Sequence, residues 1–338
     1  RPMSHFFRQN FSQVTNPPID SLRERRVMTL DTRLGNLSNI LDQDESQTRI
    51  LQLQSPTLTN AQFQAMARYM GRTATSIDCT FASAGDDANA LSDAIQRIRQ
   101  EAEDAVRGGC EHIILTDEAV GQGRVAIPMI LAAGAVHSHL VSQSLRTFVS
   151  INVRSAECLD VHYFAVLIGV GATTVNAYLA EESIAERHRR GLFGDRDLTD
   201  CVARYKKAID DGLLKIMSKM GISVISSYRG GYNFETIGLS RTLVAEVFPG
   251  MPSRISGIGL TGIQRRSLKL HGEAYRHKVT ALPIGGIYRY RKGGETHAFE
   301  AALVHTLQNA VASDSYQLYK RYADGMNQRP PFDLRDLL

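Results

Sequence analysis

Polar side chains gather where short runs of β-branched residues end. In α/β folds the carboxyl ends of parallel strands hold the chemistry, so these positions are the first candidates for a site. The set comprises Thr80, Thr116-Asp117-Glu118, Asn152, Arg154, Asn176 and Ser226-Ser227-Tyr228-Arg229. It contains no general acid and base placed beside an obvious nucleophile. We interpret these groups as hydrogen-bonded partners at a sheet edge, with an active site as the alternative, and we assign no catalytic residue.

Histidine and cysteine spacing gives no metal site. His137 and His139 lie two apart on an expected helix, so their side chains face different sides. HExxH and GxSxG motifs are absent, as are the cysteine spacings of zinc and iron–sulfur sites. We therefore predict no metal ligand and interpret His162 and the other two histidines as structural. The four cysteines, Cys79, Cys110, Cys158 and Cys201, are expected to be small core residues.

Two glycine-rich segments could approach a phosphate. Gly257, Gly259 and Gly262 match GxGxxG, but Leu282 stands where a dinucleotide site needs an acid, and no clear helix follows. We interpret this match as a tight glycine turn. A second segment, with Gly285-Gly286 and Gly293-Gly294 around alternating aromatic and basic residues, is expected to be a domain-contact loop; a phosphate site is the alternative.

Composition excludes several classes of protein. The chain has 338 residues, of which 43% are hydrophobic and 22% charged, and its formal net charge is +4. These values are typical of a globular protein, do not suggest disorder, and lack the basic density of a nucleic-acid binder. No apolar run reaches about 18 residues, so we expect no membrane span. Unpaired cysteines favour a cytoplasmic location. The chain begins with Arg1 rather than Met, so we expect it to be a fragment of a longer protein.

Strand and helix patterns alternate from Ile77 onward, which predicts an α/β fold with a parallel sheet, either a (β/α) barrel or a doubly wound sheet. The candidate strands are Ile77–Phe81, His112–Thr116, Thr147–Val153, Thr173–Ala177, Ile222–Ser226 and Arg254–Ile258. The candidate helices are Ala61–Tyr69, Ala88–Arg107, Arg124–Ser144, Leu159–Ile168, Asp200–Met220, Leu239–Val247, Ala298–Asp314 and Tyr316–Gly325. Periodicity is lost after Leu270, so we place a boundary between residues 1–272 and 273–338.

Several phrases resemble the glutamate synthase large (alpha) subunit. They occur in family order and span nearly the whole chain. They are Gln13–Glu24 with Val27–Leu30, Gly212–Ser223, Ser227–Gly231 with Phe234-Glu235, Ser253–Leu260, and Gly285–Tyr288 with Arg291–His297. The segment Arg154–Phe164 is looser than the family phrase, which weakens any role assigned to it. On this resemblance, residues 1–272 are the central domain and 273–338 the linker and N-terminal lead-in to the FMN-binding synthase domain.

The resemblance implies a fold and an activity. The fold is a degenerate (β/α) TIM-barrel-like domain resembling the FMN-linked oxidoreductase barrel. The parent enzyme converts L-glutamine, 2-oxoglutarate and reductant to two L-glutamate, with FMN and a [3Fe–4S] cluster in the large subunit. FAD, [4Fe–4S] clusters and NADPH belong to a smaller partner subunit, and the assembly is an oligomer. On this resemblance, no cofactor has its complete binding site within this segment. The segment would connect the glutaminase and FMN domains and help to channel ammonia.

The resemblance also suggests site residues. Residues expected to shape the ammonia path or interdomain coupling are Thr15, Asn16, Pro17, Pro18, Ile19, Asp20, Ser55 and Pro56. A rigid interdomain turn without ammonia contact is the alternative. Met28 is expected near the FMN and 2-oxoglutarate site because a thioether packs well against such groups; ordinary core packing is the alternative.

Two other functions remain open from sequence. A free-standing FMN barrel oxidoreductase would bind flavin, although no convincing phosphate-binding helix start is present. A purely structural spacer would affect assembly only. NADPH is the expected electron donor, and ferredoxin is the alternative.

Overall fold

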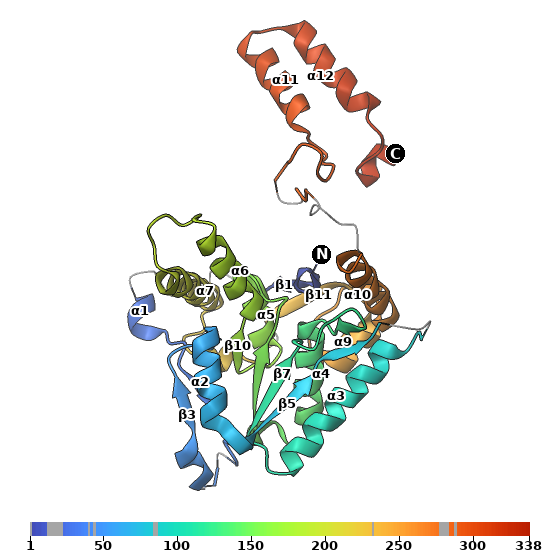
Figure 1. Cartoon of the computed structure of the whole chain (residues 1–338). Helices are drawn as coiled ribbons and strands as arrows, with labels where there is room; N and C mark the ends of the chain where they lie inside the picture. The colour runs from blue at the N-terminus through green and yellow to red at the C-terminus, as the bar shows by residue number, and fades with distance from the viewer. Residues whose placement is uncertain are drawn as a thin grey trace. The chain divides into compact units, whose positions relative to one another are not determined.

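The computed structural model describes residues 2–11, 23–39, 41–42, 45–83, 87–231, 233–276, 284–286 and 289–338. The chain forms two compact units, Arg1–Tyr275 and Arg276–Leu338. Figure 1 draws both, and each is described here by itself. The assignment of 1–272 and 273–338 to named domains of a larger enzyme stays a prediction.

A five-stranded parallel sheet is the centre of the first unit. Its order is β4 (Thr57–Leu58), β10 (Thr174–Asn176), β9 (Ser150–Arg154), β7 (His112–Thr116) and β5 (Ala74–Asp78). All neighbours are parallel, and β7 pairs along its whole length with β5 on one side and β9 on the other. The side chains of β7 and β9 are almost all buried, as expected for a sheet covered by helices.

The prediction of an α/β fold with a parallel sheet is confirmed. From β5 through β7 and β9 to β10, spatial neighbours follow chain order, and a helix connects each pair: α3 (Ala90–Arg107), α4 (Met129–Ser142) and α5 (Val161–Gly169). Consecutive units of a (β/α) barrel have this order. Among the described residues no pairing joins the two ends, β4 and β5, so the sheet is a barrel-like segment and not a closed ring.

Three further helices belong to the first unit: α2 (Asn60–Met70), α6 (Tyr178–Arg189) and α7 (Leu198–Met220). A capping box starts α2, in which Thr59 and Gln62 satisfy each other's backbone N–H groups. Asp197 caps α7 by accepting from the N–H of Asp200, and Gly221 ends it in the left-handed conformation. Figure 1 shows β5, β7 and β10 in one sheet, in which the unlabelled β9 lies between β7 and β10, with α2 and α3 flanking them.

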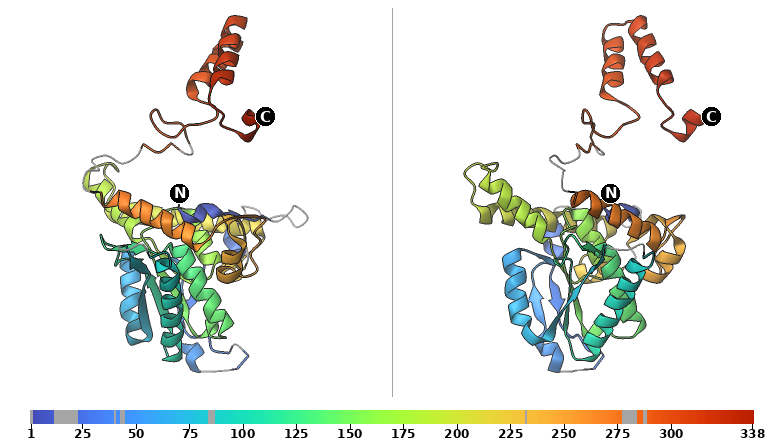
Figure 2. Two further views of the ribbon diagram at one scale, coloured as in Figure 1. Left: turned by 90° about the vertical axis from the view of Figure 1, so that its right-hand side faces the viewer. Right: turned by 45° about the vertical axis from the view of Figure 1, so that its right-hand side comes forward.

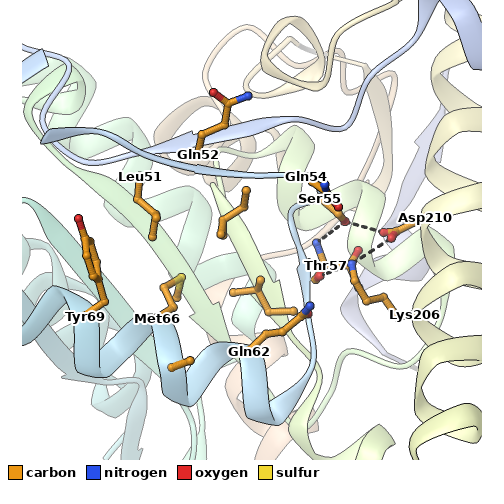
Figure 3. A pocket seen from close by; sticks show the side chains of 13 residues that line it. Leu51, Gln52, Gln54, Ser55, Thr57, Gln62, Met66, Tyr69, Lys206 and Asp210 are labelled. Carbon is orange, nitrogen blue, oxygen red and sulfur yellow. Dashed lines mark hydrogen bonds and ion pairs between the residues drawn. The ribbon is translucent and has the colours of Figure 1, made fainter. Parts of the chain in front are cut away.

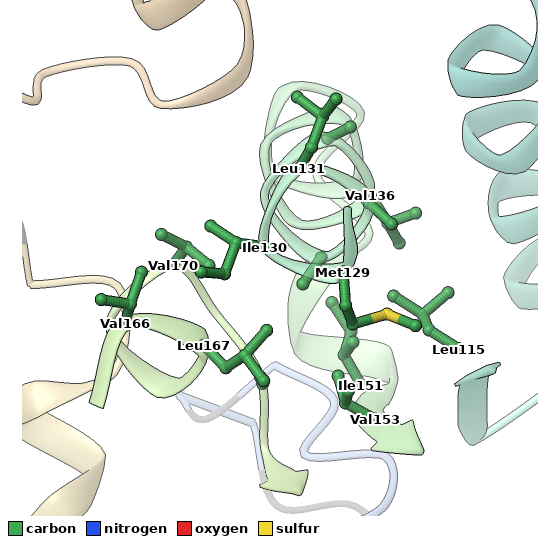
Figure 4. Close-up of a cluster of buried hydrophobic side chains, with 14 of the residues drawn as sticks. Leu115, Met129, Ile130, Leu131, Val136, Ile151, Val153, Val166, Leu167 and Val170 are labelled. Atoms are coloured by element: carbon green, nitrogen blue, oxygen red, sulfur yellow. The ribbon is translucent and has the colours of Figure 1, made fainter. Parts of the chain in front are cut away.

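Small and aliphatic residues of α4 fill the main core. Nine of its residues are buried, and Gly134 lies so close to Phe248 that a Cβ would overlap the ring. Figure 4 shows Met129 and Ile130 of α4 beside Leu167 of α5, near Leu115, Ile151 and Val153 of the sheet. None of these six side chains is exposed. Their burial from water is the main force that holds helices to sheet.

A second sheet completes the first unit. Strand β11 (Phe234–Leu239) pairs antiparallel with β1 (Phe7–Gln9) and parallel with β12 (Ile255–Ile258). Helices α8 (Ile225–Tyr228), α9 (Arg241–Val247) and α10 (Leu260–Ala274) accompany these strands. Phe7 makes edge-to-face contacts with Phe234 and Phe248, which ties the N-terminal strand to this sheet.

Two antiparallel strand pairs and several short helices also belong to the first unit. The antiparallel pairs are β2 (Thr32–Leu34) with β3 (Leu51–Leu53) and β6 (Thr80–Ala82) with β8 (Arg124–Ala126). The short helices are α1 (Glu24–Val27) and the 3₁₀ turns Met3–Phe6, Glu45–Arg49, Gly71–Thr73 and Arg146–Phe148.

The second unit is a helical hairpin. Figure 2 shows α11 (Ala301–Ala312) and α12 (Tyr316–Gln328) as two neighbouring helices joined by a short turn. Asp314 has a positive φ in this turn, and Ser315 caps α12 by accepting from the N–H of Leu318. Gly325 lets α12 approach Leu303 of α11, because a Cβ there would lie 2.7 Å from a leucine methyl carbon. A 3₁₀ turn, Leu334–Leu337, follows.

Several predicted boundaries are wrong. The predicted helix Arg124–Ser144 is strand β8 followed by α4, because Pro128 lacks an N–H and α4 begins after it. The predicted strand Ile222–Ser226 is an isolated bridge between Val224 and Thr29 that leads into α8. Helices α6 and α10 and strand β11 were not predicted. Each helix in the described ranges is too short or too polar to span a lipid bilayer.

Candidate functional site

Ser55 borders a cavity of about 660 Å³. The cavity lies between strand β3, helix α2 and helix α7. Figure 3 shows Leu51, Met66 and Tyr69 on one side and Ser55, Thr57, Lys206 and Asp210 on the other. The first group is apolar, apart from the tyrosine hydroxyl, and the second group is polar and hydrogen-bonded. The hollow therefore has an apolar part and a hydrogen-bonded polar edge, and Gln52, Gln54 and Gln62 also line it.

Hydrogen bonds fix the polar edge to α7. The Ser55 hydroxyl donates to Asp210 Oδ1 at 2.6 Å and accepts from the Thr57 N–H at 3.0 Å. Lys206 Nζ donates to the Thr57 carbonyl at 2.7 Å and to Asp210 Oδ2 at 3.0 Å. Lys206 and Asp210 are one helical turn apart, and their side chains are 21% and 20% exposed. We call Ser55, Thr57, Lys206 and Asp210 the α7 clamp.

The α7 clamp is suited to positioning rather than to catalysis. Ser55 has a carboxylate partner but no imidazole to remove its proton, so it is not an activated nucleophile. Pro56 is buried, and its carbonyl accepts from the Val175 N–H at 2.8 Å, which sets β4 beside β10. Thr57 Oγ1 is buried without a hydrogen-bond partner in the described part of the chain. The turn through Ser55 and Pro56 is thus held from both sides.

The other residues expected on the ammonia path, Thr15, Asn16, Pro17, Pro18, Ile19 and Asp20, lie outside the described residues. Met28 is 8% exposed and belongs to the main core cluster of the first unit. The next residue, Thr29, forms the bridge to Val224. The role of Met28 near FMN stays a prediction.

The carboxyl ends of the strands bring the polar candidates together. Asp117 is 1% exposed; it accepts from the Ser155 hydroxyl at 2.9 Å and from the Ala156 N–H. Burial raises the pKa of this carboxyl, although these hydrogen bonds and one from Tyr178 favour the ionised form. Asn152 in β9 and Asn176 in β10 are fully buried. Asn152 donates to the Ile113 carbonyl and Asn176 to the Leu58 carbonyl.

Arg154 organises the same edge. Its guanidinium lies 5.0 Å from the ring centre of Phe63 and 4.9 Å from that of Tyr178. It forms an ion pair with Glu118 at 2.8 Å and donates to Asn176 Oδ1 at 2.6 Å. Because its guanidinium is already engaged by these residues of the same chain, Arg154 is not free to bind a substrate.

Sequence reasoning missed Glu157. Its carboxylate accepts from the Tyr163 hydroxyl at 2.6 Å and from the Met129 N–H at 3.1 Å. Burial raises the pKa of Glu157, and the nearby Asp117 raises it further. The only sequence feature that pointed to Glu157 is an acidic residue shortly before the start of a helix at Val161. Glu157 joins the start of α4 to α5. The adjacent Cys158 is fully buried, and burial raises the pKa of its thiol, so it is not an activated nucleophile.

The GxGxxG segment joins a strand to a helix, so the expectation that no helix follows is wrong. Gly259 is the N-cap of α10. Packing accounts for two of its glycines. A Cβ on Gly257 would overlap the Gly238 backbone of the neighbouring strand, and one on Gly262 would lie 2.8 Å from Ile258. Close approach of strands and helix therefore explains the motif without a nucleotide.

Of the second glycine segment, residues 287 and 288 lie outside the described residues. Gly285 accepts from the Glu295 N–H, and Gly294 is packed against Gly285, so the loop closes on itself. Its role in domain contact stays a prediction.

Histidines find partners within the chain. His139 Nε2 lies 2.7 Å from Glu103, and His162 Nε2 lies 3.0 Å from the Ser4 carbonyl. In the described ranges no three side chains of the metal-binding types come together. All four cysteines are buried and unpaired.

Comparison with known proteins identifies the family of this chain. The glutamate synthase central domain family matches residues 1–240, and the chain belongs to this family. The glutamate synthase [NADPH] large chain of Azospirillum brasilense is 69% identical over 338 residues, which are 100% of this chain and 22% of that protein. The large chain of Bacillus subtilis (strain 168) is 38% identical over 336 residues, 98% of this chain and 22% of that protein. The chain thus spans about a fifth of the length of these relatives.

Proposed function

We propose that this chain is the central segment of a glutamate synthase large chain, which forms two L-glutamate from L-glutamine, 2-oxoglutarate and reductant. The observation that carries the proposal is the 69% identity to such a large chain over the whole of this chain. The proposed parent is an oxidoreductase that contains FMN and a [3Fe–4S] cluster. Residues 1–272 are its central domain, and 273–338 lead into its FMN-binding domain.

The cofactors of the parent are held mainly outside this chain. Within the described residues no group of metal-binding side chains exists, and the four cysteines are buried singly. We propose that the iron–sulfur ligands lie in other parts of the enzyme. When bound, FMN supplies the hydride that reduces the imine formed from 2-oxoglutarate and ammonia. In this chain Met28 is the residue proposed to face that site.

The proposed role of the segment is to connect the glutaminase and FMN domains and to help channel ammonia. Near neutral pH ammonia in bulk water is mostly protonated, and ammonium has no lone pair to attack a ketone. A path closed to bulk water keeps the molecule reactive and prevents its loss. The α7 clamp supports this role because it holds the Ser55–Pro56 turn rigidly at a cavity. Thr15 to Asp20 are proposed to line or shape the same path.

NADPH, through a smaller subunit with FAD and [4Fe–4S] clusters, is the proposed electron donor. The two bacterial relatives above are named for NADPH. The 69% identity to the first of these carries the assignment, because ferredoxin-dependent glutamate synthase 2 of Synechocystis, at 35%, is nearly as similar to this chain as the Bacillus subtilis protein, at 38%. We further propose a cytoplasmic oligomer.

The activity test uses the complete large chain expressed with its small subunit. We expect oxidation of NADPH that requires both glutamine and 2-oxoglutarate, with glutamate as the product. Reduced ferredoxin replacing NADPH as the effective donor would overturn the donor assignment alone. Absence of glutamate formation with either donor, in enzyme that contains FMN, would overturn the proposed activity.

A further inference from the structure

His137, on α4, has one ring nitrogen that is bonded within the fold and one that is not. Arg146 Nε donates to His137 Nδ1 at 3.0 Å, and the other Arg146 nitrogens donate to the carbonyls of Val149 and Gly171. An arginine N–H can only donate, so Nδ1 is the acceptor and the neutral ring carries its proton on Nε2. Arg146 therefore fixes the tautomer that His137 adopts.

The Nε2 edge is the free edge of this ring. Nδ1 lies against Arg146 and Gly171, whereas a Cβ on Gly230 would lie 3.3 Å from Nε2 and 3.5 Å from Cε1. Within the described part of the chain Nε2 finds no hydrogen-bond acceptor, yet it is not sealed from solvent as the unpartnered nitrogens of Arg229 are. This N–H is therefore a donor that a ligand can reach.

The His137 ring is uncharged at neutral pH. Burial, and then the charges of Arg146 and Arg229, lower the pKa of His137 to about 3. An uncharged ring offers its Nε2–H to an acceptor but supplies no full charge to balance an anion. The hydrogen bond from Arg146 polarises the ring and strengthens the Nε2–H as a donor.

A cavity of about 240 Å³ adjoins this edge of the ring. His137 and Gly230 both line it, so the Nε2 edge, next to Gly230, is the part of the ring turned to the cavity. An apolar cavity of about 150 Å³ can hold benzene, so this one has room for a substituted ring.

The rest of the cavity wall is mainly hydrophobic. Val141 is 52% exposed at its rim, and Phe248 and Met251 are buried. Ser138, the other polar side chain of the wall, donates its hydroxyl hydrogen to the Ala135 carbonyl at 3.2 Å. An aromatic ligand suits the phenylalanine ring and the thioether. A carboxylate would lose its hydration here without contacting a cation, which is costly.

We propose that this cavity binds a small neutral aromatic molecule that carries an acceptor oxygen, as an aryl ketone does. The oxygen accepts from His137 Nε2, and the ring packs against Phe248 and Met251. Arg146 is a positioning residue, because it holds the tautomer that places the proton on Nε2. This site is separate from the α7 clamp and does not depend on the proposed function.

Fluorine NMR titration with para-fluoroacetophenone, on the complete protein that contains this chain, tests the site. The control ligand, para-fluoro-α-methylstyrene, has the same shape but a methylene group in place of the carbonyl oxygen. We expect the wild type to bind the ketone at millimolar concentration. The ratio of ketone affinity to styrene affinity should fall roughly fivefold in His137→Phe, because only the ketone loses a hydrogen bond. Taking this ratio cancels the difference in hydration between the two ligands.

Two valine variants locate the binding without changing His137. Val141→Trp narrows the rim of the cavity and should weaken the binding of both ligands at least about tenfold, as expected when a bulky side chain fills a binding pocket. Val120→Trp, at a 39% exposed valine after β7, is the matched control and should bind both as the wild type does.

Three results would overturn the proposal. The first is a wild type that does not bind the ketone at millimolar concentration. The second is ketone binding by Val141→Trp that is as tight as in the wild type, since the ligand would then lie elsewhere. The third is an unchanged affinity ratio in His137→Phe. The first two results do not depend on whether His137→Phe folds.

Discussion

At the scale of single residues, partly buried charges in this chain stabilise the fold through specific partners. Asp210 holds both the Ser55 hydroxyl and the Lys206 ammonium at hydrogen-bond distance. Its neighbour Asp211 pairs with Lys207 in solvent, where the two side chains are 60% and 70% exposed. The helix therefore offers two adjacent aspartates with the same chemistry and different burial.

Asp210→Ala should destabilise the protein by about 1–3 kcal/mol, because Ser55 and Lys206 both lose a partner in a partly buried site. Asp211→Ala is the matched control and should change the free energy of unfolding by at most about 0.5 kcal/mol, as expected for an exposed ion pair. Urea denaturation of both variants gives the comparison. Equal effects would show that the α7 clamp contributes no more than an exposed pair.

His112 makes stability depend on pH. It is 5% exposed and 2.8 Å from the Ser150 hydroxyl, and burial lowers its pKa from 6.5 to about 4. Below pH 6.5 the unfolded chain takes up a proton that the folded chain does not. The contribution of His112 is therefore full above 6.5 and is lost as the pH falls towards 4.

Relative to His112→Asn, the wild type should lose up to about 1.4 kcal/mol per pH unit between pH 6 and pH 4.5. Denaturation curves of the two proteins across this range measure the difference. Parallel stability profiles would mean that His112 titrates alike in the folded and unfolded states.

At the scale of elements, close helix packing depends on glycine. Gly212 lies in α7 against α5, and a Cβ there would come 2.5 Å from a methyl carbon of Val161. Gly272 lies in α10, with no atom within 4 Å of such a Cβ. The two positions differ in packing alone, because both are inside helices.

Gly212→Ala should therefore destabilise the protein by about 1–3 kcal/mol through overpacking. Gly272→Ala should stabilise it by up to about 1 kcal/mol through helix propensity. Thermal unfolding of both variants checks the opposite signs. If Gly212→Ala were as stable as the wild type, α5 and α7 would not be in the close contact described.

Local sequence patterns predicted the elements that have strong local signals. The run His112–Thr116 matches β7 at both ends, because five consecutive residues are suited to a buried parallel strand. Strand β11 was missed because Glu235 and Gly238 interrupt its apolar pattern. Helix α6 carries many charges and buries only Ala180, so its periodicity is weak.

The residues of the candidate site were harder to predict from the sequence than the fold. Ser55 was singled out, but its partner Asp210 is 155 residues away in sequence. Such a contact depends on the tertiary arrangement of β4 and α7, which no local pattern specifies. Arg229 was likewise noted only as a residue expected at a strand end, whereas the structure places it after α8 beside His137 and Arg146.

At the scale of the whole molecule, the first unit is a compact α/β module, and the proposed function places it inside a larger enzyme. The parallel sheet, its helices and the α7 clamp fix the Ser55–Pro56 turn, which the proposed function places on the ammonia path. On the proposed function, such a unit would contribute to activity by holding a path closed between two reaction centres. Its effect should appear in the coupling of the two reactions and not in the chemistry of either one.

The most direct measurement compares glutamine hydrolysed with 2-oxoglutarate converted, in the complete enzyme carrying Thr15→Leu. Thr242→Leu, at an exposed position on α9, is the control. We predict that hydrolysis outruns synthesis in Thr15→Leu while FMN content stays normal, and that the control remains coupled one to one. One-to-one coupling in Thr15→Leu as well would contradict the channelling role of the Thr15–Asp20 segment and leave it a scaffold.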